Sequence, residues 1–420
     1  MTWRRSLCIA CSLSALALAL FLPRPSVADD EEPGVGPPSS WDLPLEIHAF
    51  VSQGAFKTSA NNYLGSSRHG SLKFTEVGIN LTKTLGDRLR IGAQLFTQEV
   101  GSLGNYNAKF DWFYLDYRFA NWLGIRAGRT KLPFGLYNEL NDIDAARVPI
   151  LLPQSVYPLG NRNFLLAQTG VEIYGRLPLA AAGALEYRLY AGSIFVDLST
   201  RNTPYTISRL ETPYVVGGRL LWETPIDGLR LGGSLQALRL DYDLLFPAAI
   251  YMPLVASGTL PASFDGTLHG KLPAVLWITS LEYAAQELLL AFEYSRWNTD
   301  NQISVPLLPP PYKIDSERLY GMVAYRFSPW FYPGAYYSVL FPDVDKRSLF
   351  HAGSDYGRQS YQHDAALTLR FDLGAHWILK LEGHYLHGTA ALDRTLNDNR
   401  DLNTLDADWF LFLAKTTVFF

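Results

Sequence analysis

The charged side chains that recur at alternate positions of this sequence are its best candidates for chemistry. Carboxylates and guanidinium groups attract water, and rings of such groups can select ions by charge. Acids share these faces with the bases in similar number, so we expect a polar surface with a weak ion preference. The basic candidates, which fall on consecutive segments, are Arg90, Arg118, Arg126, Arg176, Arg188 and Arg219.

The histidines offer less chemistry. His384 and His387 are an odd number of residues apart, so on a strand they point to opposite faces and cannot share a metal ion. His363 and Asp364 are neighbours and have the same problem. The sequence contains no nucleophile elbow and no phosphate-binding glycine-rich loop. We therefore expect no enzyme active site, no metal and no cofactor.

The segments that carry the charges alternate apolar and polar residues with a period of two, which is typical of strands. Leu379 and Leu381, for example, flank Lys380. Strands with this pattern can cross a membrane, because one face meets lipid and the other meets water. About 16 such segments occur, so we predict an all-β, transmembrane, antiparallel up-and-down barrel over residues 44–420. The segments are 44–53, 71–83, 87–99, 107–120, 122–130, 166–178, 183–195, 213–225, 228–242, 272–285, 287–298, 315–328, 330–342, 359–372, 375–388 and 405–420.

The connections between these segments alternate in length. Short ones such as 85–87 and 373–375 take turns with long ones such as 131–165 and 243–271. A barrel whose two chain ends lie on the periplasmic side has short turns on that side and longer loops outside. A soluble β-sandwich gives no reason for this regularity, so the pattern favours the barrel.

The first residues have the features of an export signal. Arg4 and Arg5 precede an apolar run and a small-residue cleavage motif that ends at Ala28. We therefore predict a signal peptide over 1–28. The stretch 29–43 is acidic and rich in Gly, Pro and Ser, so we expect a disordered periplasmic tail there.

The last predicted strand is apolar and aromatic and ends at Phe420. Such a strand would invite aggregation in water unless lipid or a neighbouring strand covered it. It also resembles the end of bacterial outer-membrane barrel proteins, where the terminal aromatic residue is read during assembly. The resemblance implies a Gram-negative outer membrane, contact with its lipid and lipopolysaccharide, and recognition of Phe420 by the barrel-assembly machinery.

Composition excludes several other classes. The two cysteines, Cys8 and Cys11, lie inside the predicted signal peptide, so the exported chain has no disulfide and no thiol site. The 40 acidic residues outnumber the 36 basic ones, and some of the bases lie in the signal peptide. This balance argues against a nucleic-acid partner.

A motif at the end of the fifth segment resembles that of a known family. Residues 126–136 read Arg-Ala-Gly-Arg-Thr-Lys-Leu-Pro-Phe-Gly-Leu, similar to the Gly-Arg-x-Lys-x-Pro-Phe-Gly signature of the phosphate-selective porin O and P family and its relatives. The resemblance implies a trimeric porin that passes small hydrophilic, often anionic solutes. Phosphate selectivity is not implied, because acids oppose the basic residues. The positions that match, mainly as a structural elbow, are Gly128, Arg129, Lys131, Pro133, Phe134 and Gly135.

The 131–165 connection is the candidate constriction. It is the longest and the third of the outer loops, the same place as the loop that folds into the lumen of known porins. Its apolar residues, such as Ile150 and Tyr157, would be buried on the inner wall while its polar residues face the lumen. The loop acids and the wall arginines would then create a transverse field, unless those arginines pair with wall acids such as Glu172. The expected constriction residues are Lys131, Glu139, Asp142, Asp144 and Arg147.

These features predict a water-filled channel for passive diffusion of small hydrophilic solutes, anionic ones among them. Two apolar outer stretches, 244–264 and 305–312, support an alternative function: a channel specific for hydrophobic or aromatic compounds. They could instead cap the mouth, contact lipid or contact neighbouring subunits. A phospholipase-like barrel enzyme is a minor alternative, because a Ser/His dyad leaves no local signature.

Overall fold

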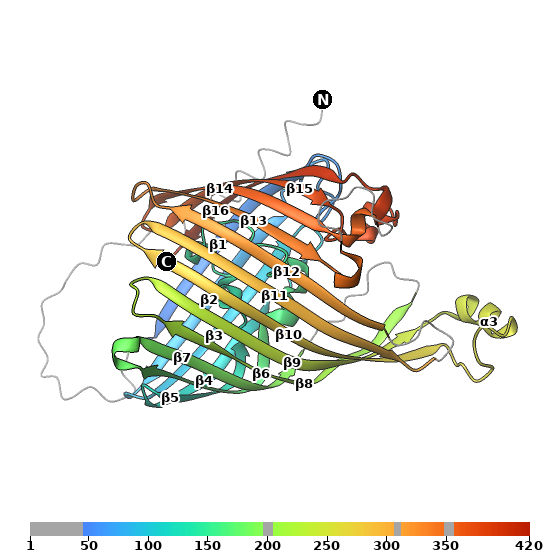
Figure 1. The fold of residues 1–420 in the computed structure, drawn as a ribbon, viewed down its shortest axis with the longest axis horizontal. Helices are drawn as coiled ribbons and strands as arrows, with labels where there is room; N and C mark the ends of the chain where they lie inside the picture. The colour runs from blue at the N-terminus through green and yellow to red at the C-terminus, as the bar shows by residue number, and fades with distance from the viewer. Residues whose placement is uncertain (1–44, 196–204, 306–311, 348–356) are drawn as a thin grey trace, which may run out of the picture. The chain divides into compact units, whose positions relative to one another are not determined.

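The chain folds into a closed barrel. The computed structural model describes residues 45–195, 205–305, 312–347 and 357–420. Within these ranges 16 strands pair antiparallel with their neighbours in sequence, and β1 closes the barrel on β16 (Figure 1). The strands are β1 (Glu46–Thr58), β2 (Phe74–Leu85), β3 (Leu89–Val100), β4 (Lys109–Ala120), β5 (Leu123–Lys131), β6 (Ala167–Pro178), β7 (Ala184–Ile194), β8 (Thr206–Glu223), β9 (Leu229–Leu245), β10 (Thr267–Ala285), β11 (Leu288–Ile303), β12 (Tyr312–Tyr325), β13 (Phe331–Phe341), β14 (Gln362–Gly374), β15 (Trp377–Gly388) and β16 (Asp408–Phe419).

Helices are short and lie in the connections. None in the described part of the chain has the length and apolarity that a membrane-crossing helix needs. The α-helices are α2 (Arg162–Leu165) and α3 (Ala248–Ala256), and the 3-10 helices are η1 (Asn138–Leu140), η2 (Asp144–Ala146), η3 (Leu159–Asn161), η4 (Ala180–Ala182), η5 (Val344–Lys346), η6 (Arg358–Ser360), η7 (Arg394–Asn397) and η8 (Leu402–Thr404).

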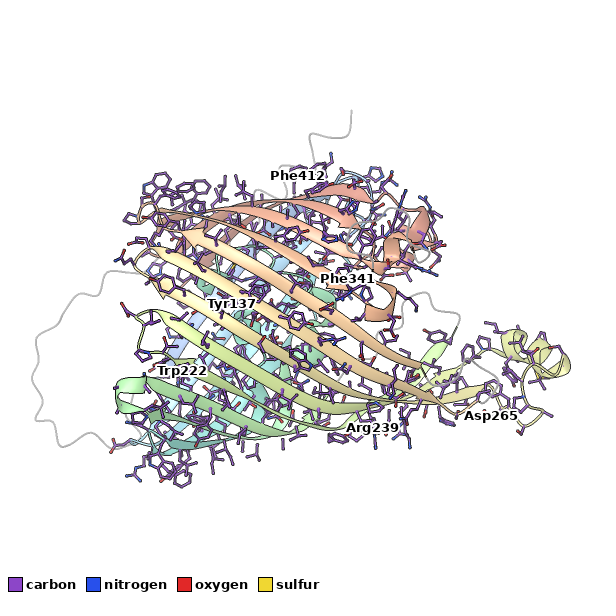
Figure 2. All side chains as sticks on the ribbon, viewed as in Figure 1. Tyr137, Trp222, Arg239, Asp265, Phe341 and Phe412 are labelled. Atoms are coloured by element: carbon purple, nitrogen blue, oxygen red, sulfur yellow. The ribbon has the colours of Figure 1, made fainter. Side chains whose placement is uncertain are left out.

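The two faces of the wall differ as the period-two pattern predicts. On β15, Leu381 and Tyr385 are exposed on the outside, whereas Lys380, Glu382 and His384 are buried on the inside. Phe412 of β16 likewise projects from the outer surface (Figure 2). Large apolar side chains exposed around the wall in this way suit contact with lipid.

The predicted strand order and the alternation of short and long connections are confirmed. Most boundaries agree within a few residues, but β8 to β11 extend well beyond 213–225, 228–242, 272–285 and 287–298 on the side of the long connections. There they form a protrusion that carries α3 at its tip (Figure 1). The alternation fades in this part because outward positions carry charges instead of apolar residues.

Barrel closure uses the last residue. Phe420 donates its backbone N–H to Ala49 O at 3.0 Å, and Ala49 donates its own to Phe420 O at 3.1 Å. The C-terminus lies at the end of the barrel with the short turns, opposite α3 (Figure 1). The predicted signal peptide and tail, 1–28 and 29–43, lie outside the described residues, as do residues 306–311 of the second apolar outer stretch.

Candidate functional site: the barrel lumen

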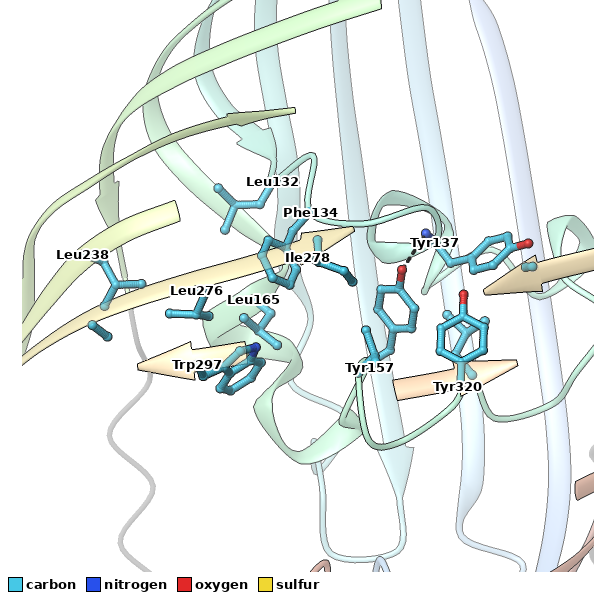
Figure 3. Close-up of a cluster of buried hydrophobic side chains, with 14 of the residues drawn as sticks. Leu132, Phe134, Tyr137, Tyr157, Leu165, Leu238, Leu276, Ile278, Trp297 and Tyr320 are labelled. Atoms are coloured by element: carbon cyan, nitrogen blue, oxygen red, sulfur yellow. Dashed lines mark hydrogen bonds between the residues drawn. The ribbon is translucent and has the colours of Figure 1, made fainter. Parts of the chain in front are cut away.

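Residues 132–166, which connect β5 to β6, pack against the inner face of the wall. We call them the lumen segment. The first cluster of buried apolar side chains joins Leu132, Phe134 and Tyr157 of the segment to wall residues such as Trp297 and Tyr320 (Figure 3). Burial of this kind stabilises the segment in one position, because its apolar groups leave water.

A second apolar cluster fixes the other half of the lumen segment. Ile150 and Leu151 are buried among residues from the strands on both sides of the closure, including Phe74 on β2 and Trp409 on β16. The two clusters lie on different parts of the circumference. The lumen segment is therefore held from more than one side of the barrel.

Glu139 connects the segment to β7 and β8. Its carboxylate pairs with Arg188, and with Arg219 at 3.0 Å. Arg188 also pairs with Glu172 of β6 at 2.6 Å. The same arginine therefore contacts an acid of the lumen segment and an acid of the wall.

Glu293 of β11 is a second anchor. This fully buried carboxylate accepts hydrogen bonds from Tyr157 Oη, from Tyr320 Oη at 2.7 Å and from the backbone N–H of Leu136 at 2.9 Å. Ser280 Oγ donates to it at 2.5 Å. A buried carboxylate with this many donors holds the segment tightly, since losing any partner leaves a buried acceptor less satisfied.

Asp144 is the anchor to β15 and β16. Its carboxylate lies 3.1 Å from Lys380 Nζ and 3.2 Å from Lys415 Nζ, and Thr417 Oγ1 donates to it at 2.8 Å. Arg147 lies 3.8 Å away. All of these charged groups are buried.

Glu382 of β15 binds the backbone beside this group. Its two carboxylate oxygens accept from the N–H groups of Ile150 at 2.6 Å and Leu151 at 2.9 Å. Arg370 of β14 donates to the carbonyl oxygens of Ala145 at 2.8 Å and Arg147 at 3.0 Å. The wall thus satisfies backbone groups that would otherwise be buried without partners.

Lys131 and Asp142, two of the predicted constriction residues, hold the start of the segment, and Arg162 holds its end. Lys131 donates to Asp142 and to the carbonyl oxygen of Glu139. Arg162 pairs with Asp111 of β4, and both side chains are buried. Asp142, Asp144 and Arg147 were expected to face the lumen, but they are buried against partners, because each finds an opposite charge within reach.

The carboxylates of the segment are strongly acidic. Burial would raise the pKa of Glu139, but Arg188 and Arg219 outweigh it and lower that pKa to about 2. The pKa of Asp142 is lowered in the same way, burial being outweighed by Lys131. These acids are therefore ionised over the neutral range.

The other arginines predicted for the pore lie toward the end with the short turns. Arg126 pairs with Asp116 at 2.9 Å and with Glu172 at 3.1 Å, and Arg176 pairs with Glu223. Arg90, Arg118 and Arg176 are exposed. Arg118, Arg176, Arg188, Glu186 and Glu223 are among the residues that line a recess of 770 Å³ at this end.

The motif that resembles the porin family makes the turn into the lumen segment. Gly128 has φ +129° and Gly135 has φ +66°, which side chains other than glycine rarely adopt. Arg129 Nε donates to the carbonyl oxygen of Asp111 at 2.9 Å, and Phe134 is buried. Pro133, also buried, lies between them. The motif thus has a structural role here.

The sequence did not single out the wall residues that hold the segment. Lys380, Glu382, Lys415 and Glu293 all fall on inward positions of their strands, so the period-two pattern marks their face. Nothing in the pattern indicates that they bind the loop. No group of three potential metal ligands comes together in the described ranges.

The closed barrel of 16 strands, its apolar outer face and its charged inner face define a porin-type fold. No protein-family model matches the chain, and no curated protein sequence matches it. An anion-selective porin from Comamonas acidovorans is 12% identical, with a TM-score of 0.52, over 90% of this chain and 100% of that one. OprB from Pseudomonas putida is 11% identical, with a TM-score of 0.53, over 90% and 94%. OmpT of Vibrio cholerae is 10% identical, with a TM-score of 0.55, over 90% and 97%.

These likenesses establish the fold over most of the chain. They do not reach the level of a family, so the finer resemblance to the phosphate-selective porin O and P family stays a prediction. What the lumen passes follows from its own residues.

Proposed function

We propose that the protein is a porin-type channel of a bacterial outer membrane through which small hydrophilic solutes diffuse. One observation carries the proposal: a closed barrel of 16 strands has charged residues on its inner face and apolar residues on its outer face. Barrels of this size enclose an aqueous path when nothing fills them. The recess lined by Arg118 and Arg176 would form part of that path.

The lumen segment would limit conduction. It is bonded to β4, to β7 through β12 and to β14 through β16. We therefore propose a conductance well below that of an unobstructed barrel with the same number of strands. Passage would follow gaps beside the segment or would require part of it to move.

A strong ion preference is not part of the proposal. Arg126, Arg188 and Arg219 each have a carboxylate partner, so their charges are largely neutralised. The exposed Arg90 and Arg118 favour at most a modest preference for anions. The homotrimer, the contact with lipopolysaccharide and the recognition of Phe420 belong to the proposal as well, on the resemblances in the sequence.

Planar bilayer recordings test the channel. The refolded protein should give discrete conductance steps, and the reversal potential under a salt gradient should indicate weak selectivity. Heat-denatured protein from the same preparation is the control. If the folded protein gave no conductance steps, this would argue against a channel. Large steps typical of an open barrel would argue against obstruction by the lumen segment.

A further inference from the structure

The inner face of β9 and β10 is apolar where a porin lumen is usually polar. Four successive inward pairs across these strands contain no charge: Leu244 with Leu268, Tyr242 with Gly270, Leu240 with Leu272, and Leu238 with Ala274. The outward positions between them carry Arg239, Asp241 and Asp243. At about 3.3 Å per residue, the apolar stripe is about 20 Å long.

The outer end of the stripe joins an exposed apolar hairpin. Leu244 and Leu268 belong to an apolar cluster that also contains Leu260 and Phe264. Beyond it, α3 has no buried residue and exposes Ile250, among others, at the tip of the protrusion near Asp265 (Figure 2). Exposed apolar surface of this kind suits contact with apolar molecules.

The inner end of the stripe reaches hydrogen-bond donors that lack acceptors. Leu276 lies between Gln236 on β9 and Trp297 on β11. Gln236 Nε2 and Trp297 Nε1 are both buried, and neither has a hydrogen-bond partner among the described residues. Buried donors of this kind normally have an acceptor. Figure 3 shows Trp297 and Leu276 beside Leu238, where the stripe meets the lumen segment.

A cation without a carboxylate lies next to these donors. The guanidinium of Arg318 stacks on Trp297, 3.4 Å from the ring centroid, and donates to Ser155 O at 3.0 Å and Ser316 Oγ at 3.2 Å. In the part of the chain that the structure describes, no acid pairs with it. This contrasts with Arg188 on β7, which pairs with two carboxylates.

We propose that this part of the lumen binds amphipathic carboxylates, that is, small molecules with an apolar body and an anionic head. The body lies along the half-buried Leu240 and Leu272, and the head pairs with Arg318 beside Trp297. The exposed hairpin supplies the first apolar contact from outside. This inference names a solute class for the proposed channel and rests on that function only for its biological purpose.

Calorimetric titration of the full-length barrel in lipid nanodiscs tests the site, with empty nanodiscs as the reference. Three probes separate the contributions: octanoate has a tail and a carboxylate, acetate has only the carboxylate, and 1-octanol has only the tail. We expect saturable binding of octanoate and, at the same concentrations, none of acetate. Arg318→Gln should weaken octanoate binding about 10-fold, in the range of a lost charge-assisted hydrogen bond, and should leave 1-octanol unchanged.

Arg296→Gln is the matched control. Arg296 is the neighbour of Trp297 on β11 but points to the opposite face of the wall, so its loss should not change octanoate binding. Octanoate binding equal to that of empty nanodiscs, or unaffected by Arg318→Gln, would overturn the inference. Acetate binding as tight as octanoate would reduce the site to a plain anion site, and 1-octanol binding as tight would remove the role of the head; either result also overturns it.

Conductance of the same preparations keeps the two proposals apart. Protein that conducts but does not bind octanoate retains the proposed function and loses this inference. Protein that binds octanoate but never conducts retains this inference and loses the proposed function.

Circular dichroism and heat-modifiable gel mobility establish that Arg318→Gln still folds as a barrel. Leu240→Asp gives a second variant, because a carboxylate on the stripe should repel the ligand without touching Arg318.

Discussion

Asp144 of the lumen segment lies 3.1 Å from Lys380 of β15, and both side chains are almost completely buried. Lys380 Nζ also donates to the carbonyl oxygens of Asp144 at 2.7 Å and Arg147 at 2.8 Å. One lysine therefore binds both the side chain and the backbone of the segment. Because a buried charge is costly without its partner, this contact should control how firmly the segment stays in place.

Replacing Asp144 should loosen the lumen segment. Asp144→Asn leaves Lys380 and Lys415 without their shared carboxylate, and breaking a buried pair in this way costs about 3–5 kcal/mol. We expect single-channel conductance to rise and current noise to increase. Asp408→Asn, which removes an exposed acid of β16, is the matched control. Unchanged conductance in Asp144→Asn would contradict the anchoring role.

The pairing of Glu139 should make the channel insensitive to pH until it is strongly acidic. Its pKa lies at about 2, below the ordinary 4.5, because Arg188 and Arg219 outweigh burial. A depressed carboxylate stabilises the folded contact fully above its ordinary pKa, and this contribution is lost as pH falls toward 2. Conductance should therefore stay constant from pH 8 to about 5 and change between about 4 and 2.

Glu139→Gln supplies the control for this pH dependence. The variant lacks the titrating carboxylate, so at neutral pH it should already show much of the conductance that the natural protein reaches in acid. Its own change between the two pH values should be smaller. An identical acid response in both proteins would assign the effect to other groups.

A disulfide should lock the segment to the wall. A Cβ atom on Gly334 of β13 would lie 3.0 Å from Cγ1 of Val148, close enough for a cysteine pair at these positions to cross-link after small adjustment. Outside the predicted signal peptide the sequence has no cysteine to compete. Val148→Cys with Gly334→Cys should oxidise spontaneously and shift in non-reducing gels, and each single variant should not. Failure to cross-link would place the segment elsewhere.

The ring of Phe420 should matter for assembly and not for the finished barrel. Its backbone pairs with Ala49, which any residue except proline can do, while its side chain is exposed. Phe420→Ala should lower the yield of assembled barrel in cells severalfold and leave the thermal stability of refolded protein nearly unchanged. Phe412→Ala removes another exposed aromatic residue of β16 and should leave the yield intact. Equal yields for both variants would count against a terminal signal.

Much of the fold could be read from the sequence, because alternation along a strand is a local property. Leu379, Lys380 and Leu381 reveal their faces without knowledge of any other strand. The sequence did not predict the protrusion, because its strands were recognised only by this local alternation. Outside lipid, positions such as Asp241 and Asp243 no longer need to be apolar, so the pattern that marks a strand disappears although β9 continues.

By itself, the sequence determined the number of strands and their faces, since both depend on neighbouring residues. Which charges meet was decided only by the tertiary structure. Asp144 and Lys380 are 236 residues apart, and only closure of β1 on β16 brings β15 round to the lumen segment. The stacking of Arg318 on Trp297 likewise depends on the register between β11 and β12. Pairing across a closed sheet is set by the packing of the whole barrel, so no local pattern records it.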